Sequence, residues 1–135
     1  MTATKNFIDT NVLFYLLSSD SVKADKAEGL LAEGGIVSVQ VLNEFAAVAV
    51  RKMGMKLPEI RSILSVIRTA CQVIPVSLQL HDDGMSIAER YGYSIFDSLI
   101  IAAALQANSE FLYSEDLHDG QSIGTLTIAN PFKGV

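Results

Sequence analysis

Short apolar runs alternate with helix-like segments along the chain, and this alternation restricts the fold more than any other feature. We expect strands at 7–8, 36–39, 72–76, 110–113 and 125–129. Helical patterns fill the intervals, at 12–17, 21–33, 40–53, 58–69, 80–91 and 95–107. Strands that are separated by helices form a parallel sheet with helices on both faces. The pattern therefore predicts an α/β fold, a three-layer α/β/α sandwich with a central parallel sheet.

Length and composition favour one domain that spans residues 1–135. Half of the residues are hydrophobic, which argues against intrinsic disorder. Cys71 is the only cysteine, so no disulfide forms within the chain, and a lone thiol suits a reducing compartment. No apolar run reaches the ~18 residues of a membrane span, and the first residues do not resemble a signal peptide. We therefore expect a cytoplasmic protein with no membrane association.

Two aspartates follow predicted strands. Asp9 comes directly after the first strand, and Asp116 lies just past the strand that ends at Tyr113. In open α/β sheets, ligands bind outside the carboxyl ends of the strands. Both carboxylates are therefore expected at the same end of the sheet, although Asp9 alone fits a helix N-cap and Asp116 alone fits a turn.

Asp97 lies in a segment that is apolar nearly all round. Its neighbours at helical spacing are Ile100, Ile101 and Ala104, so its side chain runs along a buried face. A buried carboxylate needs a partner or a metal ion. The pattern Ser94-x-x-Asp97 also resembles a capping box, and the two roles are compatible.

Glu44 borders an apolar helical stripe rather than opposing it. The residues three before and four after it are Val41 and Val48. The alternative is a glutamate at the helix boundary that reaches solvent.

Taken together, these acids predict a metal site. Carboxylates that gather in one pocket repel each other unless a cation neutralises them. Oxygen ligands select Mg²⁺ or Mn²⁺ over zinc, and two such ions suit attack on a phosphodiester. His81 and His118 have no metal spacing and are expected on the surface. The predicted metal and catalytic residues are Asp9, Glu44, Asp97 and Asp116.

The basic residues are unevenly distributed. The net charge is −5, from 15 acidic and 10 basic residues. Removing the four proposed site acids leaves 15 − 4 = 11 acids against 10 bases, which is nearly balanced. Half of the bases fall in one stretch that only Glu59 opposes, namely Arg51, Lys52, Lys56, Arg61 and Arg68. This stretch is either a solvated helix face or a set of contacts to RNA phosphates.

Four segments in order resemble the PIN-domain family. They are 7–13, 41–45 around Glu44, 96–100 around Asp97 and 113–117 around Asp116. Their order, their spacing and the total length are most similar to the toxin of a VapBC-type toxin–antitoxin pair. The resemblance implies a sheet in the order 3-2-1-4-5 and an Mg²⁺- or Mn²⁺-dependent endoribonuclease that acts on RNA when its antitoxin is removed.

The resemblance also implies roles for particular residues and partners. The family's metal and catalytic acids fall on Asp9, Glu44, Asp97 and Asp116, and supporting polar positions fall on Asn11 and Ser114. The family often has threonine where Ser114 stands. The family mostly forms homodimers, and the antitoxin commonly reaches the acidic pocket with a basic side chain. Asp119 is a further acid to which the sequence assigns no role.

Three other functions fit parts of the pattern. A PIN-domain nuclease of RNA processing would work without an antitoxin. A non-catalytic binding module would use its acids for folding only, and metal titration would separate it from an enzyme. A receiver-like phosphoacceptor also has an acidic pocket, but the expected lysine after a late strand is missing.

Overall fold

The computed structural model describes residues 6–134, whose strands form one sheet. The sheet order is β3-β2-β1-β4-β6-β5, and every neighbouring pair is parallel except β5 with β6. The strands are β1 (Asn6–Ile8), β2 (Gly35–Ser38), β3 (Cys71–Ile74), β4 (Phe111–Tyr113), β5 (Ser122–Ile123) and β6 (Leu126–Ala129). The predicted order 3-2-1-4-5 is confirmed, with β6 as the fifth predicted strand. The sheet is not wholly parallel, because β5 adds an antiparallel edge.

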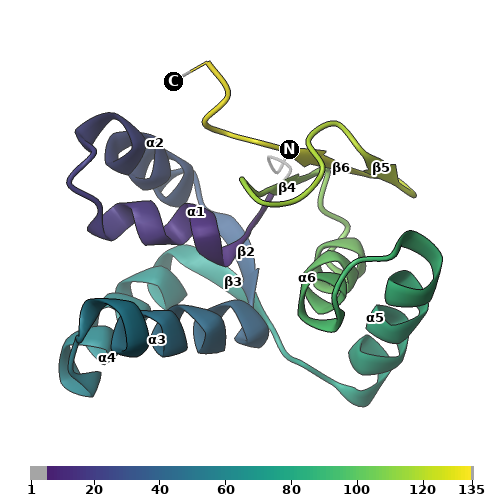
Figure 1. Cartoon of the computed structure of the whole chain (residues 1–135), viewed down its shortest axis with the longest axis horizontal. Coiled ribbons are helices and arrows are strands. Elements are labelled where there is room, and N and C mark those ends of the chain that lie inside the picture. Colours follow the sequence, from purple (N-terminus) through teal and green to yellow (C-terminus); the bar gives the residue numbers. More distant parts are fainter. Residues whose placement is uncertain (1–5, 135) are drawn as a thin grey trace.

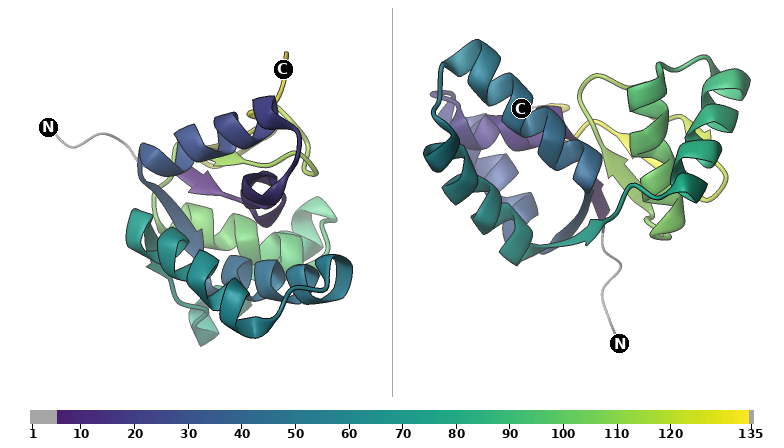
Figure 2. Two further views of the ribbon diagram at one scale, coloured as in Figure 1. Left: turned by 90° about the vertical axis from the view of Figure 1, so that its left-hand side faces the viewer. Right: turned by 90° about the horizontal axis from the view of Figure 1, so that it is seen from below.

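Helices cover both faces of this sheet, so the three-layer sandwich is confirmed. The helices are α1 (Thr10–Phe14), a 3₁₀ turn (Tyr15–Leu17), α2 (Ser21–Ala32), α3 (Val39–Met53), α4 (Leu57–Ala70), α5 (Leu78–Tyr91) and α6 (Ile95–Gln106). Helices α1 to α4 lie on one side of the sheet and α5 with α6 on the other (Figure 1). The view from below separates the same two groups (Figure 2). None of the helices within the described residues is long and apolar enough to cross a membrane.

The core lies where the central strands meet the helices. Phe7 of β1 and Leu112 of β4 have no exposed surface, and neither do Phe45 of α3 and Ile101 of α6. Because β1 lies in the middle of the sheet, the chain that leaves it enters the interior of the molecule. A polar residue at that point is therefore held in a largely dry environment.

Local chemistry sets the ends of the helices near the site. Asp9, Ser38 and Ser94 cap α1, α3 and α6 through hydrogen bonds from backbone N–H groups. Gly54 ends α3 with φ of 61°, a left-handed conformation that glycine adopts without strain. The third strand stops at Ile74 rather than at Val76, since Pro75 has no N–H to donate to a sheet. β3 is an edge strand, as this proline predicts.

Helices α5 and α6 pack closely through Gly84, which suggests a test of the fold. A Cβ atom at Gly84 would lie 2.8 Å from Cδ2 of the buried Leu99, whereas a Cβ at Gly29 of α2 would meet nothing within 4 Å. Gly29→Ala should raise the free energy of unfolding by roughly 0.5–1 kcal/mol through helix propensity. Gly84→Ala should lower it by about 1–2 kcal/mol, because Leu99 must move within a packed core. Urea unfolding of both variants measures this, and equal stabilisation by both would contradict the α5–α6 packing.

Candidate active site

The carboxylate of Asp9 is buried at the carboxyl end of β1, with 5% of the residue exposed. Its Oδ1 accepts a hydrogen bond from the Thr10 backbone N–H at 2.7 Å. Its Oδ2 accepts from the Ser114 hydroxyl at 2.9 Å and from the Asn11 side-chain amide at 3.1 Å. Both oxygens are therefore held in a fixed orientation by residues at the start of α1 and just after β4.

Asn11 joins the ends of β1 and β4. Its amide nitrogen also lies 3.3 Å from Oδ2 of Asp116, and its Oδ1 accepts from the Glu115 backbone N–H at 2.9 Å. The Ser114 hydroxyl in turn accepts from the Asp116 backbone N–H at 3.3 Å. The two aspartates that follow strands thus lie at the same end of the sheet, with Asn11 between them.

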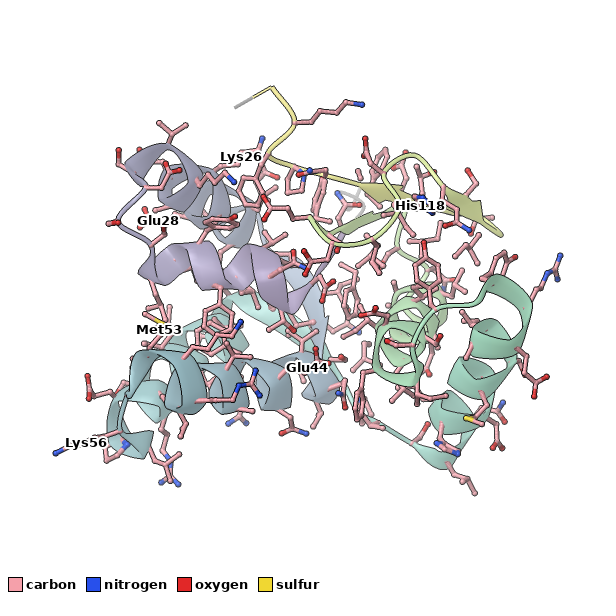
Figure 3. All side chains as sticks on the ribbon, viewed as in Figure 1. Lys26, Glu28, Glu44, Met53, Lys56 and His118 are labelled. Atoms are coloured by element: carbon pink, nitrogen blue, oxygen red, sulfur yellow. The ribbon has the colours of Figure 1, made fainter. Side chains whose placement is uncertain are left out.

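Glu44 and Asp97 enter from helices on opposite sides of the sheet. Glu44 is half-buried on α3, and its Oε2 accepts from the Gln40 side-chain amide at 2.8 Å. Asp97 is half-buried in the first turn of α6, and its backbone N–H donates to the Ser94 hydroxyl at 3.1 Å. Figure 3 shows Glu44 at the end of α3 that faces α6. The capping hydrogen bond at Ser94 is confirmed, and it leaves the Asp97 carboxylate for another role.

All four acids line one cleft of about 660 Å³. Asn11 and Thr10 also line it, together with apolar residues of α1 and α3 and with Phe96 of α6. The predicted site residues therefore come together, although they belong to four separate parts of the chain.

The acids of this cleft influence one another's protonation. The pKa of Asp9 is raised from 3.8 to about 7, chiefly by burial. Hydrogen bonds from Ser114 and Thr10 oppose this rise, and the negative charges of Glu44 and Asp97 add to it. Burial also raises the pKa of Glu44, and the charge of Asp97 adds to this against the hydrogen bond from Gln40. A cation in the cleft would relieve the unfavourable interactions that cause these shifts.

The side chains of the cleft suit a hard cation that keeps some of its water ligands, rather than an ion that protein ligands enclose completely. Within residues 6–134, no group of three or more histidine, cysteine, aspartate or glutamate side chains is arranged to hold a metal ion. Mg²⁺ usually keeps several water ligands and takes only one or two carboxylates. Every acid here offers oxygen alone, and the buried Thr10 hydroxyl has no hydrogen-bond partner. The residues therefore fit an ion that reaches part of the cleft through water.

The five clustered bases do not act as one surface. Arg51 and Lys52, on the last turn of α3, line the acidic cleft. Arg61 and Arg68 line a different groove, beside α4. Lys56 lies between the two helices and points away from the molecule (Figure 3). The structure thus leaves two of the five beside the acids.

Sequence reasoning missed a second polar cluster at the edge of the cleft. The Tyr15 hydroxyl donates to Oε1 of Glu115 at 2.6 Å, and the Lys23 ammonium lies 3.0 Å from Oε2 of the same carboxylate. The hydrogen bond from Tyr15 and then the contacts of Lys23 lower the pKa of Glu115. Glu115 thus forms an ion pair, whereas the four predicted site acids form none with the residues that the structure describes. Residues 92 and 100 positions apart make these contacts, so no local pattern signals them.

Asp119 has a structural role. Its carboxylate accepts from the Asn130 backbone N–H at 2.8 Å and pairs with the Lys133 ammonium at 3.1 Å. It therefore attaches the C-terminal segment to the loop after β4. His81 and His118 are exposed, as predicted.

The family comparison matches this architecture. The PIN domain model matches residues 7–118, a range that contains all four acids of the cleft. The chain belongs to the PIN-domain family. The matched part of this PIN domain ends before β5 and β6, which complete the sheet. A search of curated protein sequences found no match.

Three solved structures with a similar fold are a toxin and two complexes. The PIN domain is 20% identical to Mycobacterium tuberculosis VapC20, a sarcin–ricin loop cleaving toxin, with a TM-score of 0.65 over 83% of this chain and 90% of that one. For a toxin–antitoxin complex from Klebsiella pneumoniae the TM-score is 0.70 and the identity 20%, over 95% of this chain and 98% of that one. For VapBC2 from Rickettsia felis, bound to a DNA fragment from their promoter, the TM-score is 0.67 and the identity 20%, over 93% of this chain and 97% of that one. At this identity, the likeness establishes a shared fold.

The buried carboxylate of Asp9 predicts a pH dependence of stability. The pKa of Asp9 is about 7 in the folded protein, against 3.8 for an aspartate in the unfolded chain. Between these two pH values the folded protein therefore binds more protons than the unfolded chain. In EDTA, Asp9 should therefore make wild type progressively less stable as pH rises from 4 to 7, by at most about 1.4 kcal/mol per pH unit. Asp9→Asn should remove this contribution. Urea unfolding of both proteins across this range measures the difference, and parallel pH profiles would show that Asp9 titrates normally.

Proposed function

We propose that this PIN domain is an Mg²⁺- or Mn²⁺-dependent endoribonuclease and the toxin of a toxin–antitoxin pair. The observation that supports it most is the burial of Asp9 beside Glu44 and Asp97 in a cleft where, among the described residues, none of these three acids forms an ion pair. Such a site favours a divalent ion, and the RNA phosphate is a substrate on which that ion would act. The resemblance to VapC toxins gives the substrate class.

Each residue has a specific task in this proposal. Asp9, Asp97 and Asp116 would hold the ion, with Glu44 completing the site directly or through water. The bound ion would lower the pKa of a water molecule and stabilise charge on the phosphate. Asn11 and Ser114 fix the Asp9 carboxylate, so that its oxygens keep one orientation. Arg51 and Lys52 would contact the RNA backbone at the edge of the cleft.

The same electrostatics accounts for inhibition. An antitoxin that places a basic side chain in the cleft would neutralise the acids and displace the metal ion. Two of the similar structures are complexes of a toxin with its antitoxin, which supports this part of the proposal. A homodimer and a cytoplasmic location belong to the same proposal, and analytical ultracentrifugation of the purified chain tests the dimer.

Metal binding gives the first test. Asp97→Asn keeps the shape of the side chain, and the hydrogen bond to Ser94 comes from the backbone. The variant should therefore fold, yet lose most of the rise in melting temperature that Mn²⁺ gives wild type, because ligand-linked stabilisation follows affinity. Asp82→Asn, an exposed acid on α5, is the matched control and should keep the full rise. If Asp97→Asn responds to Mn²⁺ like wild type, Asp97 only caps its helix.

Cleavage gives the second test. The purified chain should cut fluorescent RNA with Mg²⁺ or Mn²⁺, and EDTA should abolish the reaction. Asp9→Asn should reduce the rate at least about 10²-fold, since this carboxylate would hold the metal ion that the reaction requires. Asp82→Asn should cleave at the wild-type rate. Cleavage by Asp9→Asn at the wild-type rate would reject this site.

The two bases beside the cleft give the third test. Each phosphate that is neutralised on single-stranded RNA contributes about 0.7 to the slope of log K against log salt. In the inactive Asp9→Asn background, reversing Arg51 and Lys52 to glutamate should reduce that slope by about 1.4 or more. Fluorescence anisotropy across a salt series measures it. An unchanged slope would make these two residues part of a solvated helix face.

A further inference from the structure

A second groove lies beside α4, and the proposed nuclease does not use it. It is lined by residues of α3, α4 and the edge strand β3, and no residue lines both this groove and the acidic cleft. Its volume is about 930 Å³, against about 660 Å³ for the cleft. It contains Arg61 and Arg68, two of the bases that the sequence associates with RNA.

One face of α4 borders this groove with an alternating stripe. Leu57, Arg61, Leu64 and Arg68 follow one another at spacings of four, three and four residues, which places them along one side of a helix. Leu57 is 66% exposed, and both arginines are exposed. The two arginine side chains leave the helix about two turns apart, which is roughly 10 Å along its axis. Apolar and basic groups therefore alternate along the stripe.

The opposite wall of the groove is apolar. Val39 and Leu42 of α3 and Val73 of β3 line it. Among the described residues that line the groove, none is acidic and none is aromatic. An exposed apolar groove is one of the features of protein-binding sites, whereas proteins that hold unpaired nucleotides usually supply aromatic rings for stacking. The composition thus favours a peptide over RNA.

Charge argues against a second copy of this chain as the occupant. A two-fold dimer places the same patch of each subunit against the other. Both sides of such a contact would then carry Arg61 and Arg68, and no described residue that lines the groove is an acid that could pair with them. Like charges in an interface cost several kcal/mol. The complementary occupant carries carboxylates.

We propose that this groove binds an acidic amphipathic helix of a protein partner. Its apolar side chains would fill the space between α3 and α4, and two carboxylates seven residues apart would pair with Arg61 and Arg68. Arginine pairs with carboxylates through two parallel hydrogen bonds, which also fixes the register of the helix. Helices that dock into grooves in this way are recognised by apolar anchors at helical spacing. The groove is therefore a protein-binding site distinct from the nuclease cleft.

Designed peptides test this binding site on the full chain. The probe is a fluorescein-labelled helical peptide with leucines at helical spacing on one face and two glutamates seven residues apart. The matched peptide has lysines in place of these two glutamates. By fluorescence anisotropy, the acidic peptide should bind at least about tenfold more tightly than the basic one. Overall charge alone would favour the basic peptide, because the chain itself has a net charge of −5. Tighter binding of the acidic peptide therefore reports on the groove. Equal binding, or no binding of the acidic peptide, would overturn the proposal.

Charge reversal in the protein supplies the matched test. Arg61→Glu with Arg68→Glu should invert the preference, so that the basic peptide binds more tightly. Arg90→Glu, an exposed arginine on α5, should leave the preference unchanged. Circular dichroism confirms folding, and Arg61→Gln with Arg68→Gln, which should abolish the preference, replaces the reversal if the reversed variant does not fold.

Two further measurements test single-stranded RNA and a second copy of this chain as the occupant of the groove. The reversed variant should bind fluorescein-labelled single-stranded RNA as tightly as wild type, and it should sediment as wild type does. Loss of RNA binding in the reversed variant would make the groove an RNA interface. A change from dimer to monomer would make it a contact between copies. Either result would overturn the proposal, and neither depends on whether the chain cleaves RNA.

Discussion

The buried carboxylate of Asp9 is the constraint on which the rest of the site depends. β1 lies at the centre of the sheet, so the residue that follows it is largely removed from water. A charged group there is costly unless hydrogen bonds and a counter-ion compensate it. The fold supplies hydrogen bonds from Thr10, Asn11 and Ser114, but no basic residue within 6–134 forms an ion pair with this carboxylate. The raised pKa of Asp9 reflects the part of this cost that the hydrogen bonds do not compensate.

The contrast with Glu115 shows that this arrangement is local. Glu115 lines the same cleft, yet Tyr15 and then Lys23 bind its carboxylate and lower its pKa. Among the described residues, Glu115 thus has an ion-pair partner, whereas the acids around Asp9 pair with no base, although Arg51 and Lys52 line the same cleft. These acids still require a positive charge. A divalent ion and a basic side chain of a protein partner would both satisfy that requirement, which links the proposed catalysis to the proposed inhibition.

Much of this arrangement follows from local sequence patterns. Strand ends place Asp9 and Asp116 together, and helical spacing places Glu44 and Asp97 beside apolar faces. The cluster of Tyr15, Lys23 and Glu115 was not predicted, because its members are far apart in the chain. The strand β5 was missed because two residues carry no periodic signal. The five bases form one stretch in the sequence, whereas the turn at Gly54 separates α3 from α4, and the bases of the two helices line different surfaces.

Anomalous diffraction from crystals soaked in Mn²⁺ tests the central claim most directly, because it locates the ion without any assay of activity. The account predicts an anomalous peak in the cleft, in contact with a carboxylate oxygen of Asp9, Asp97 or Asp116, and its absence from Asp9→Asn crystals soaked in the same way. A cleft without a peak under these conditions, or an ion that binds only to acids outside it, would contradict the account.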